Sequence, residues 1–371
     1  MNPEPEIAVL VVGPANRETG GIARYIAAQR EHLPPSVGME TYDIAPSADG
    51  EGRRWLVREL LHAGKRALRF PFQSRPDIVH VHTSHERSFY LSSWFVFVSR
   101  YLWRRPTILH VHGSAFDTFV QSESWLVRFF QRRVFAAATA VIVLSAYWKH
   151  ILEPVSGQTK LFVLPNAIDP DEYDPHFDVT PPHVVFISNH VERKGIREFV
   201  EAVEQLQETG LAFRVTIAGK GPLSYLAAGL ATRYQDVSYV GYVSETEKRA
   251  LLDSASIYVL PTHAEGLPIG ILEAMAGGNA ILSTPVGSIP ELIRPENGRL
   301  VTPGNADDLT TALAALLADP TLVRNMAQQN RTLVEEAYTW QEVAMQLTAL
   351  YARLLDRPHE IDRDTPPVVI E

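Results

Sequence analysis

Short apolar runs alternate with amphipathic stretches along most of the chain. A run of four to six aliphatic residues fits a strand that is buried on both faces of a parallel sheet. Apolar residues spaced three and four apart fit helices that cover such a sheet. The expected strands include residues 7–12, 140–144, 184–187 and 257–260, and the expected helices include 22–29, 196–208 and 245–254. The pattern predicts an α/β fold.

The alternation stops and restarts once. A Pro- and Asp-rich segment, residues 169–182, separates two series of strands and helices. We therefore expect two doubly wound, Rossmann-like domains facing a central cleft, because strand carboxyl ends carry ligand groups in this architecture. The predicted parts are an acceptor-side domain (1–170), a linker (171–182), a donor domain (183–340), a helix crossing back to the first domain (341–355) and a loose tail (356–371).

Residues 263–278 carry the strongest pattern of candidate chemistry. Pro268 suits the first position of a helix and Gly277 or Gly278 its C-terminal cap, so Glu265 falls in the preceding loop and Glu273 inside the helix. Free N–H groups at a helix start bind anions. Two carboxylates beside such a site could hold sugar hydroxyls on either side of a diphosphate. The alternative is that Glu265 is solvated and Glu273 is ordinary helix surface.

This stretch resembles the donor-site signature of family 4 glycosyltransferases of the GT-B fold. The resemblance rests on Glu265 and Glu273, with seven residues between them, Gly266 after the first and Ala-Met-Ala after the second. It implies that Glu265 meets hydroxyls of the transferred sugar and that Glu273 binds the nucleotide ribose. The backbone between them would hold the pyrophosphate, at Gly266, Leu267, Pro268 and Ile269.

Two glycine loops and one aromatic loop extend the resemblance. Gly20 and Gly21 precede the first helix, and Gly219 and Gly221 follow a strand of the second domain. Glycines in such loops allow a ligand to approach the backbone, although many serve turn geometry only. The resemblance implies that both loops face the donor, and that the loop with Tyr242 and Val243 lies against the nucleobase.

The loop after the first strand of the second domain departs from the family pattern. Lys194 is retained and could neutralise a diphosphate leaving group. The residue directly after the strand is Asn189, where the family usually has arginine. An asparagine donates hydrogen bonds but brings no charge, so His190 or Arg193 would have to compensate.

Two predicted strands alternate histidines with aliphatic residues. His80 and His82 share one strand face, as do His110 and His112, so a metal site must be considered. No acidic or cysteine ligand stands at metal-site spacing, and we expect no metal. We expect His80 and His110 to pack against a neighbouring layer. The strand-ending His112 matches the family histidine near the transferred sugar, and we expect Asp117 and His82 on the acceptor side.

The predicted activity is transfer of a hexose from a nucleotide-diphosphate sugar, with UDP favoured over GDP, to a glycan, lipid-linked glycan or glycolipid. The resemblance implies retention of anomeric configuration and no bound metal or cofactor. The catalytic candidates are His112, Glu265 and Lys194. Three alternatives stay open: a nucleotide-sugar epimerase, a sugar-phosphate synthase and a non-catalytic nucleotide-sugar binding protein.

Composition limits the surroundings of the protein. The chain has no cysteine, and no N-terminal signal or membrane-spanning run is visible. We expect a cytoplasmic protein that binds no nucleic acid. Residues 1–169 carry a net charge of +4, whereas the rest carries −13. Three basic, aromatic-rich stretches, 53–70, 88–105 and 125–135, lie in the positive half. They could contact an anionic membrane as interfacial helices, or their aromatics could be core and their arginines solvated.

Overall fold

The structure is a computed structural model that describes residues 5–15, 20–45, 53–113, 116–121 and 124–356. The predicted tail therefore lies almost wholly outside the described residues. The chain divides into two compact units. The N-terminal unit comprises residues 1–165 and 340–371, and the C-terminal unit comprises residues 166–339. Among the described helices, none is both long and apolar enough to cross a lipid bilayer.

The N-terminal unit is built on a six-stranded parallel sheet with strand order β2-β1-β3-β4-β5-β6. Its strands are β1 (Ile7–Gly13), β2 (Val37–Asp43), β3 (Ile78–Thr83), β4 (Thr107–Val111), β5 (Ala140–Val143) and β6 (Lys160–Val163). Its α-helices are α1 (Gly21–His32), α2 (Arg53–Arg69), α3 (Arg87–Phe97), α4 (Phe116–Val120), α5 (Trp125–Ala137), α6 (Ala146–Ser156) and α14 (Trp340–Asp356). A 3₁₀ turn, Phe70–Phe72, follows α2, and a π-helical segment, Val98–Leu102, follows α3.

The C-terminal unit repeats this plan with strand order β12-β11-β10-β7-β8-β9. Its strands are β7 (His183–Ile187), β8 (Arg214–Ala218), β9 (Val237–Gly241), β10 (Ile257–Leu260), β11 (Ala280–Ser283) and β12 (Gly298–Leu300). Its helices are α7 (Ile196–Glu208), α8 (Ser224–Arg233), α9 (Glu245–Asp253), α10 (Ile269–Ala276), α11 (Ile289–Leu292), α12 (Ala306–Ala318) and α13 (Pro320–Ala337), with 3₁₀ turns at Pro170–Glu172 and Glu192–Lys194.

In each sheet the direction in which the chain adds strands reverses once, and we call this point the sheet reversal. It determines where the ligand loops lie. In the N-terminal unit the chain steps from β1 to β2 on one side and from β3 to β6 on the other, and in the C-terminal unit it steps both ways from the β7–β10 pair. Because parallel crossovers are right-handed, a reversal puts successive helices on opposite faces of the sheet. The loops that diverge at the reversal leave room for ligands at the strand carboxyl ends. The predicted α/β class with two doubly wound units is confirmed.

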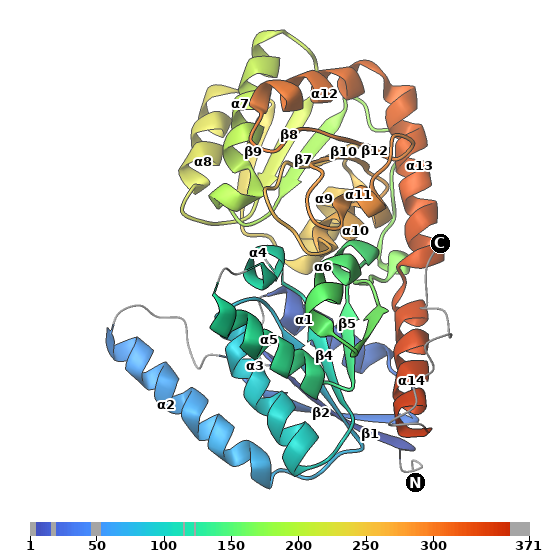
Figure 1. Cartoon of the computed structure of the whole chain (residues 1–371). Coiled ribbons are helices and arrows are strands. Elements are labelled where there is room, and N and C mark those ends of the chain that lie inside the picture. The colour runs from blue at the N-terminus through green and yellow to red at the C-terminus, as the bar shows by residue number, and fades with distance from the viewer. Residues whose placement is uncertain (1–4, 16–19, 46–52, 114–115, 122–123, 357–371) are drawn as a thin grey trace. The chain divides into compact units, whose positions relative to one another are not determined.

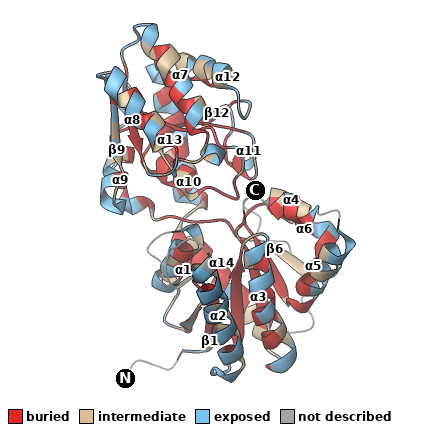
Figure 2. Cartoon of the chain, turned by 90° about the vertical axis from the view of Figure 1, so that its left-hand side faces the viewer, coloured by how far each residue is buried: buried red, intermediate tan, exposed pale blue. Residues whose placement is uncertain are grey.

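Burial follows the layering (Figure 2). The central strands β3, β4, β5, β10 and β11 are buried at every position, whereas the edge strands β2, β9 and β12 are mixed and the edge strand β6 is half-buried throughout. Covering both faces of a parallel sheet explains why the central strands are continuous apolar runs.

Candidate functional site

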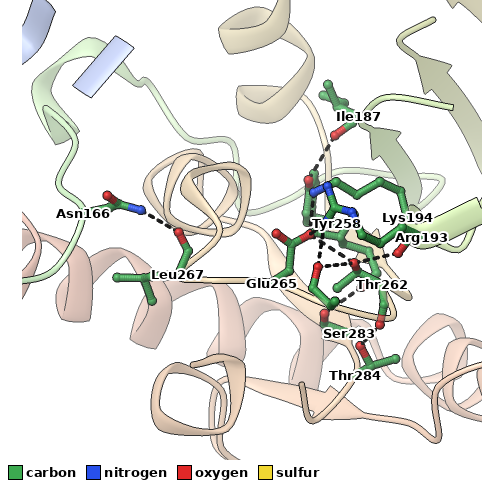
Figure 3. Close-up of polar contacts among 12 residues, drawn as sticks. Asn166, Ile187, Arg193, Lys194, Tyr258, Thr262, Glu265, Leu267, Ser283 and Thr284 are labelled. Atoms are coloured by element: carbon green, nitrogen blue, oxygen red, sulfur yellow. Dashed lines mark hydrogen bonds and ion pairs between the residues drawn. The ribbon is translucent and has the colours of Figure 1, made fainter. Parts of the chain in front are cut away.

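The Glu265 loop, residues 261–268, follows β10 at the sheet reversal of the C-terminal unit. Figure 3 shows the polar contacts around Glu265. Glu265 is 6% exposed. Its Oε1 accepts a hydrogen bond from Lys194 Nζ, lies 3.0 Å from the Thr262 hydroxyl and lies 3.8 Å from Arg193 NH1. A buried carboxylate is expensive unless it is paired and hydrogen-bonded. The reading of Glu265 as a solvated loop residue is therefore wrong.

The backbone around Glu265 is held from several elements. Ser288 N donates to Gly266 O at 3.1 Å, Asn166 Nδ2 donates to Leu267 O at 2.6 Å, and Arg193 NH1 donates to Ala264 O at 2.6 Å. Gly287 lies so close that a Cβ there would stand 2.0 Å from Glu265 O. The loop can therefore hold its carboxylate and amides in one geometry.

The start of α10 differs slightly from the sequence prediction. Pro268 is the N-cap residue, one position before the helix begins at Ile269. Pro268 has no N–H, so the amide donors available to an anion here are those of Gly266, Leu267, Ile269 and Gly270. Gly277 caps the other end, as predicted.

Glu273 lies in α10 and is 8% exposed. Its Oε1 is 2.6 Å from Nζ of Lys248, a buried residue of α9 that also reaches Glu245 Oε2 at 2.5 Å. Glu273 is therefore not ordinary helix surface. Burial, together with the charges of Glu273 and Glu265, raises the pKa of Tyr258, whose hydroxyl donates to Ile187 O at 3.1 Å. This phenol links the ends of β10 and β7 beside both carboxylates.

Sequence reasoning missed Lys248. The signal that could have revealed it is the scarcity of lysine: Lys194, Lys220 and Lys248 are the only lysines after residue 169. Lys194 pairs with Glu265, Lys248 pairs with Glu273, and Lys220 Nζ lies 5.6 Å from the centre of the exposed Tyr242 ring.

The loop after β7 resolves the question raised by Asn189, which is exposed. His190 is buried, with Nδ1 3.0 Å from Ser224 Oγ and Nε2 3.3 Å from Ala218 O. A carbonyl only accepts, so the His190 proton is on Nε2. Burial lowers the pKa of His190, so it does not replace the missing cation. Arg193 and Lys194 supply the positive charge, both directed at the Glu265 loop.

The glycine loops have separate explanations. Added Cβ atoms at Gly219 and Gly221 would stand 1.8 Å from Ser188 O and 2.3 Å from His190 O, so these glycines let two neighbouring loops pack together. A Cβ added at Gly20 or Gly21 would meet no atom within 4 Å, so the backbone there is open; Gly20 has a φ of +121°. Val243 is half-buried beside Tyr242.

Four histidines form a layered array on one face of β3 and β4. His80, His82 and His110 are buried, and His112, directly after β4, is half-buried. His82 Nδ1 is 2.8 Å from His112 Nε2, and His80 Nε2 is 3.2 Å from His110 Nδ1. Burial holds the pKa of His80 and of His112 at about 3 and lowers those of His82 and His110 well below their usual value. All four are neutral at pH 7.

This array corrects one sequence expectation and settles another. His82 is 1% exposed and is bonded to His112, so it lies beneath the surface that an acceptor could contact. His80 packs against a neighbouring layer, as predicted: its Nδ1 lies 2.7 Å from the hydroxyl of Tyr351 in α14. Asp117 is half-buried in α4, where its Oδ2 is 3.4 Å from the Tyr147 hydroxyl.

Nitrogens of His80, His82 and His110 lie within 4.8 Å of one another, which raises the question of a metal ion. The His80 and His82 rings are stacked, with planes only 13° apart and centroids 4.4 Å apart. Lone pairs of stacked imidazoles lie in separate parallel planes and do not converge on one ion at the usual metal–nitrogen distance of about 2.0–2.1 Å. The residues present therefore do not fit a metal without rotation of the rings.

Comparisons with known proteins match both units of the chain to glycosyltransferases. Residues 19–172 match the family model described as Glycosyltransferase Family 4, and residues 181–319 match the one described as Glycosyl transferases group 1. A mannosyltransferase of Mycolicibacterium hassiacum, named MMP alpha-(1->4)-mannosyltransferase, is 28% identical over 69% of this chain and 61% of its own length. The putative colanic acid biosynthesis glycosyltransferase WcaL of Escherichia coli is 29% identical over 60% of this chain and 59% of its own length. The matched region thus spans about three fifths of these relatives.

Solved structures share the fold. The sucrose-phosphate synthase of Thermosynechococcus elongatus superposes with a TM-score of 0.76 at 20% identity, covering 94% of this chain and 99% of its own. Anabaena HepE, solved with UDP, superposes with a TM-score of 0.71 at 15% identity over 94% of this chain and 100% of its own. The chain belongs to the family 4 glycosyltransferases of the GT-B fold.

Proposed function

We propose that this protein transfers a hexose from a nucleotide-diphosphate sugar to a glycan, lipid-linked glycan or glycolipid in glycan biosynthesis, with retention of anomeric configuration and without a metal ion. UDP is favoured over GDP. The observation that carries the proposal is the pair of buried carboxylates, Glu265 and Glu273, each neutralised by its own lysine at the sheet reversal. Relatives named for colanic acid and amylovoran biosynthesis, and HepE solved with UDP-glucose, support the same class of reaction.

The site offers a role for each group. Negative charge develops on the departing diphosphate, and the Lys194 ammonium with the amides of Gly266, Leu267 and Ile269 would stabilise it. Glu265 would orient the sugar hydroxyls, and Glu273 would bind the ribose hydroxyls. His112 of the N-terminal unit would contact the transferred sugar. Asn189 would add a hydrogen bond where the family has a cation.

The test is product analysis with purified protein, UDP-glucose, UDP-galactose, UDP-N-acetylglucosamine and GDP-mannose, in EDTA, with and without a lipid extract. Transfer of sugar to an acceptor with α-configuration from an α-donor would support the proposal. A changed nucleotide sugar without acceptor would indicate an epimerase, and transfer to a soluble sugar phosphate would indicate a synthase. Nucleotide binding without any product would indicate a binding protein. Each of these three results contradicts the proposed reaction.

We also propose that α2, α3 and α5 bring the protein to an anionic membrane. On α2 the exposed apolar residues Val57, Leu60, Leu61 and Leu68 recur at helical spacing, and Leu61 is 68% exposed, while Glu59 points inward. In a helix that covers the core of a soluble protein, the apolar side chains face inward and the charged ones face water, which is the opposite of this arrangement. Exposed cations flank the stripe at Arg54, Arg58, Lys65 and Arg69.

The neighbouring helices α3 and α5 carry further exposed apolar residues. Trp94 of α3 donates to Ala67 O of α2 at 3.0 Å, and the ring of Phe130 of α5 lies 5.5 Å from that of Tyr90 of α3. The exposed apolar residues of α3, of the π-helical segment after it and of α5 are Tyr90, Leu91, Trp94, Tyr101, Leu102, Trp125, Leu126 and Phe129. Other aromatics of the same stretches, among them Phe89, Phe95 and Trp103, are buried core. Within the same stretches, some aromatic residues therefore belong to the core, and others are exposed and could contact a membrane.

Flotation with vesicles of phosphatidylglycerol and phosphatidylcholine tests the membrane proposal. The protein should float with anionic vesicles at moderate salt, and the variant Leu60→Ser/Leu61→Ser/Leu68→Ser should bind at least tenfold more weakly. The matched control, Leu211→Ser/Tyr225→Ser, removes exposed apolar residues of the C-terminal unit and should float like the parent. Absence of flotation by the parent would overturn the proposal.

A further inference from the structure

The four histidines are arranged as two edge-to-edge pairs stacked on each other. In the pair His82–His112 the ring centroids are 5.1 Å apart, the bonded nitrogens are 2.8 Å apart and the planes differ by 24°. The nitrogens therefore lie almost on the line between the ring centres, as in a hydrogen bond made in the plane of both rings. His80 and His110 show the same relation, with centroids 5.3 Å apart and planes differing by 17°.

The protons of the His80–His110 pair are fixed by a neighbour that can only donate. Gln29 Nε2 donates to the Tyr351 hydroxyl at 2.9 Å, which leaves the Tyr351 proton for His80 Nδ1. The proton of neutral His80 is then on Nε2 and points to His110 Nδ1. The remaining His110 proton is then on Nε2, which is buried and has no hydrogen-bond partner among the described residues; the Gln29–Tyr351–His80 chain forces this placement. The Tyr25 ring stands nearly perpendicular to the His110 ring, with the two centroids 5.0 Å apart. Neither His80 nor His110 is bonded to His112.

The His82–His112 pair has one proton to share between His82 Nδ1 and His112 Nε2. In the part of the chain that the structure describes, His82 Nε2 is buried and finds no hydrogen-bond partner. A buried N–H without a partner is rarer in proteins than an unpaired acceptor. The His82 proton is therefore better placed on Nδ1, where it donates to His112. His112 must then carry its own proton on Nδ1, which is the nitrogen left for a ligand.

We propose that His82 is a positioning residue that donates from Nδ1 to His112 Nε2, so that His112 meets the transferred sugar as a hydrogen-bond donor through Nδ1–H and not as a base. This inference rests on the proposed contact of His112 with the sugar. The His110 ring stacks on that of His112 with the centroids 4.0 Å apart, and the Tyr25 ring lies 5.0 Å from that of His112, so both neighbours restrict the orientation of His112.

The array supplies a matched set of variants. His82→Phe keeps a planar ring in the stack but loses the bond to His112, whereas His80→Phe makes the same change on the same strand face without touching that bond. His82→Asn restores a polar atom on Cγ, where Nδ1 stood. If His82 positions His112, the transfer rate should fall 10- to 100-fold in His82→Phe with donor KM changed less than threefold, as is typical when a supporting partner is removed. His80→Phe should stay within threefold of the parent, and His82→Asn should recover at least part of the rate.

Nitrogen NMR of protein labelled with ¹⁵N-histidine gives a readout that does not depend on activity. The parent should show His112 as a single neutral tautomer with its proton on Nδ1. The His112 signals should change to a mixture of tautomers in His82→Phe and remain as in the parent in His80→Phe. A parent His112 with its proton on Nε2, or one that already exchanges between tautomers, would overturn the inference even if His82→Phe fails to fold.

The two proposals fail in different ways. If His112→Ala transfers sugar like the parent, the role of His112 under the proposed function is wrong. If His112→Ala loses activity while His82→Phe keeps it, the proposed function stands and the positioning role of His82 is wrong. Equal losses in His82→Phe and His80→Phe would indicate a structural role for both and would also overturn the inference.

Discussion

The two units bury polar groups at their sheet reversals by opposite means. The C-terminal unit buries full charges, with Glu265 on Lys194 and Glu273 on Lys248. The N-terminal unit buries four histidines that are neutral and share protons along the ring planes. A buried ion pair fails when one partner is removed, because the other charge is left without compensation. A neutral array instead fails when the pH falls and its members must take up protons. The two units should therefore respond to different perturbations.

The largest expected effect comes from breaking an ion pair. Lys248→Met removes one partner of the buried Lys248–Glu273 ion pair, and such a loss typically costs about 3–5 kcal/mol of the free energy of unfolding. Urea unfolding of the parent and variants measures it. The matched control Lys220→Met removes an exposed lysine and should change stability by less than about 0.5 kcal/mol.

A double variant sharpens this test. Lys248→Met/Glu273→Gln removes both charges and should recover part of the stability lost in Lys248→Met, because no uncompensated carboxylate remains. If the double variant is less stable than Lys248→Met by the full cost of a second substitution, the two residues do not form an energetic pair.

The next effect separates the two carboxylates by function. Glu265→Ala should leave nucleotide binding within about threefold and reduce transfer by about 10²–10³-fold, or about 3–4 kcal/mol of transition-state stabilisation. Glu273→Ala should weaken nucleotide binding itself. Calorimetry with UDP and initial rates of transfer measure the two quantities. Glu296→Ala, at an exposed loop carboxylate, is the control and should resemble the parent. Full transfer by Glu265→Ala would refute the assignment.

The pH dependence of stability tests the neutral array. In the folded protein the pKa of His80 is about 3, whereas an unfolded histidine has a pKa of about 6.5. The contribution of His80 to the free energy of unfolding is therefore fully present above about pH 6.5. It is lost as the pH falls towards 3, with a slope of up to about 1.4 kcal/mol per pH unit. His80→Phe should flatten the curve of unfolding free energy between pH 6.5 and 4.5, and His150→Gln, an exposed histidine, should not. Equal slopes in all three proteins would contradict buried neutral His80.

The smallest expected effect comes from weakening α9, the helix that carries Lys248, while the Lys248–Glu273 ion pair itself is kept. Ser244 caps α9 by accepting from Glu247 N, four residues before Lys248. Ser244→Ala should cost about 1 kcal/mol without changing nucleotide affinity. Thermal unfolding and UDP titration check this pair of results. A large loss of UDP affinity would show that the position of Lys248 depends on the cap.

The sequence predicted the elements whose pattern is local. Residues 196–208 form α7 with the expected bounds, and the strand, loop and helix around Glu265 are as expected except for the one-residue shift at Pro268. The prediction did not include β2, an edge strand with a mixed pattern, or α13. An edge strand needs no continuous apolar run because one side is open, so its signal is weak.

The partners within the sites could not be predicted, because they depend on three-dimensional register. The spacing showed that His80 and His82 share a face, but which histidines bond depends on the β3–β4 register, where His82 stands opposite His110, and on the tilt of the rings towards other partners. The pairing of Lys248 with Glu273 likewise depends on how α9 packs against α10. Spacing along the chain identified the carboxylates but not the cations that make their burial possible.

One measurement tests the central claim most directly: a thermal-shift titration in EDTA with UDP, GDP, ADP and TDP, each with and without its common sugars, on the parent and on Glu273→Ala. A ligand that binds only the folded state stabilises it by about 2.7 kcal/mol at a hundred times its Kd. We predict that one nucleotide, with UDP favoured, raises the Tm of the parent selectively in EDTA, and that Glu273→Ala largely loses this shift. No shift with any nucleotide, or the same shift in Glu273→Ala, would contradict a donor site built on Glu265 and Glu273.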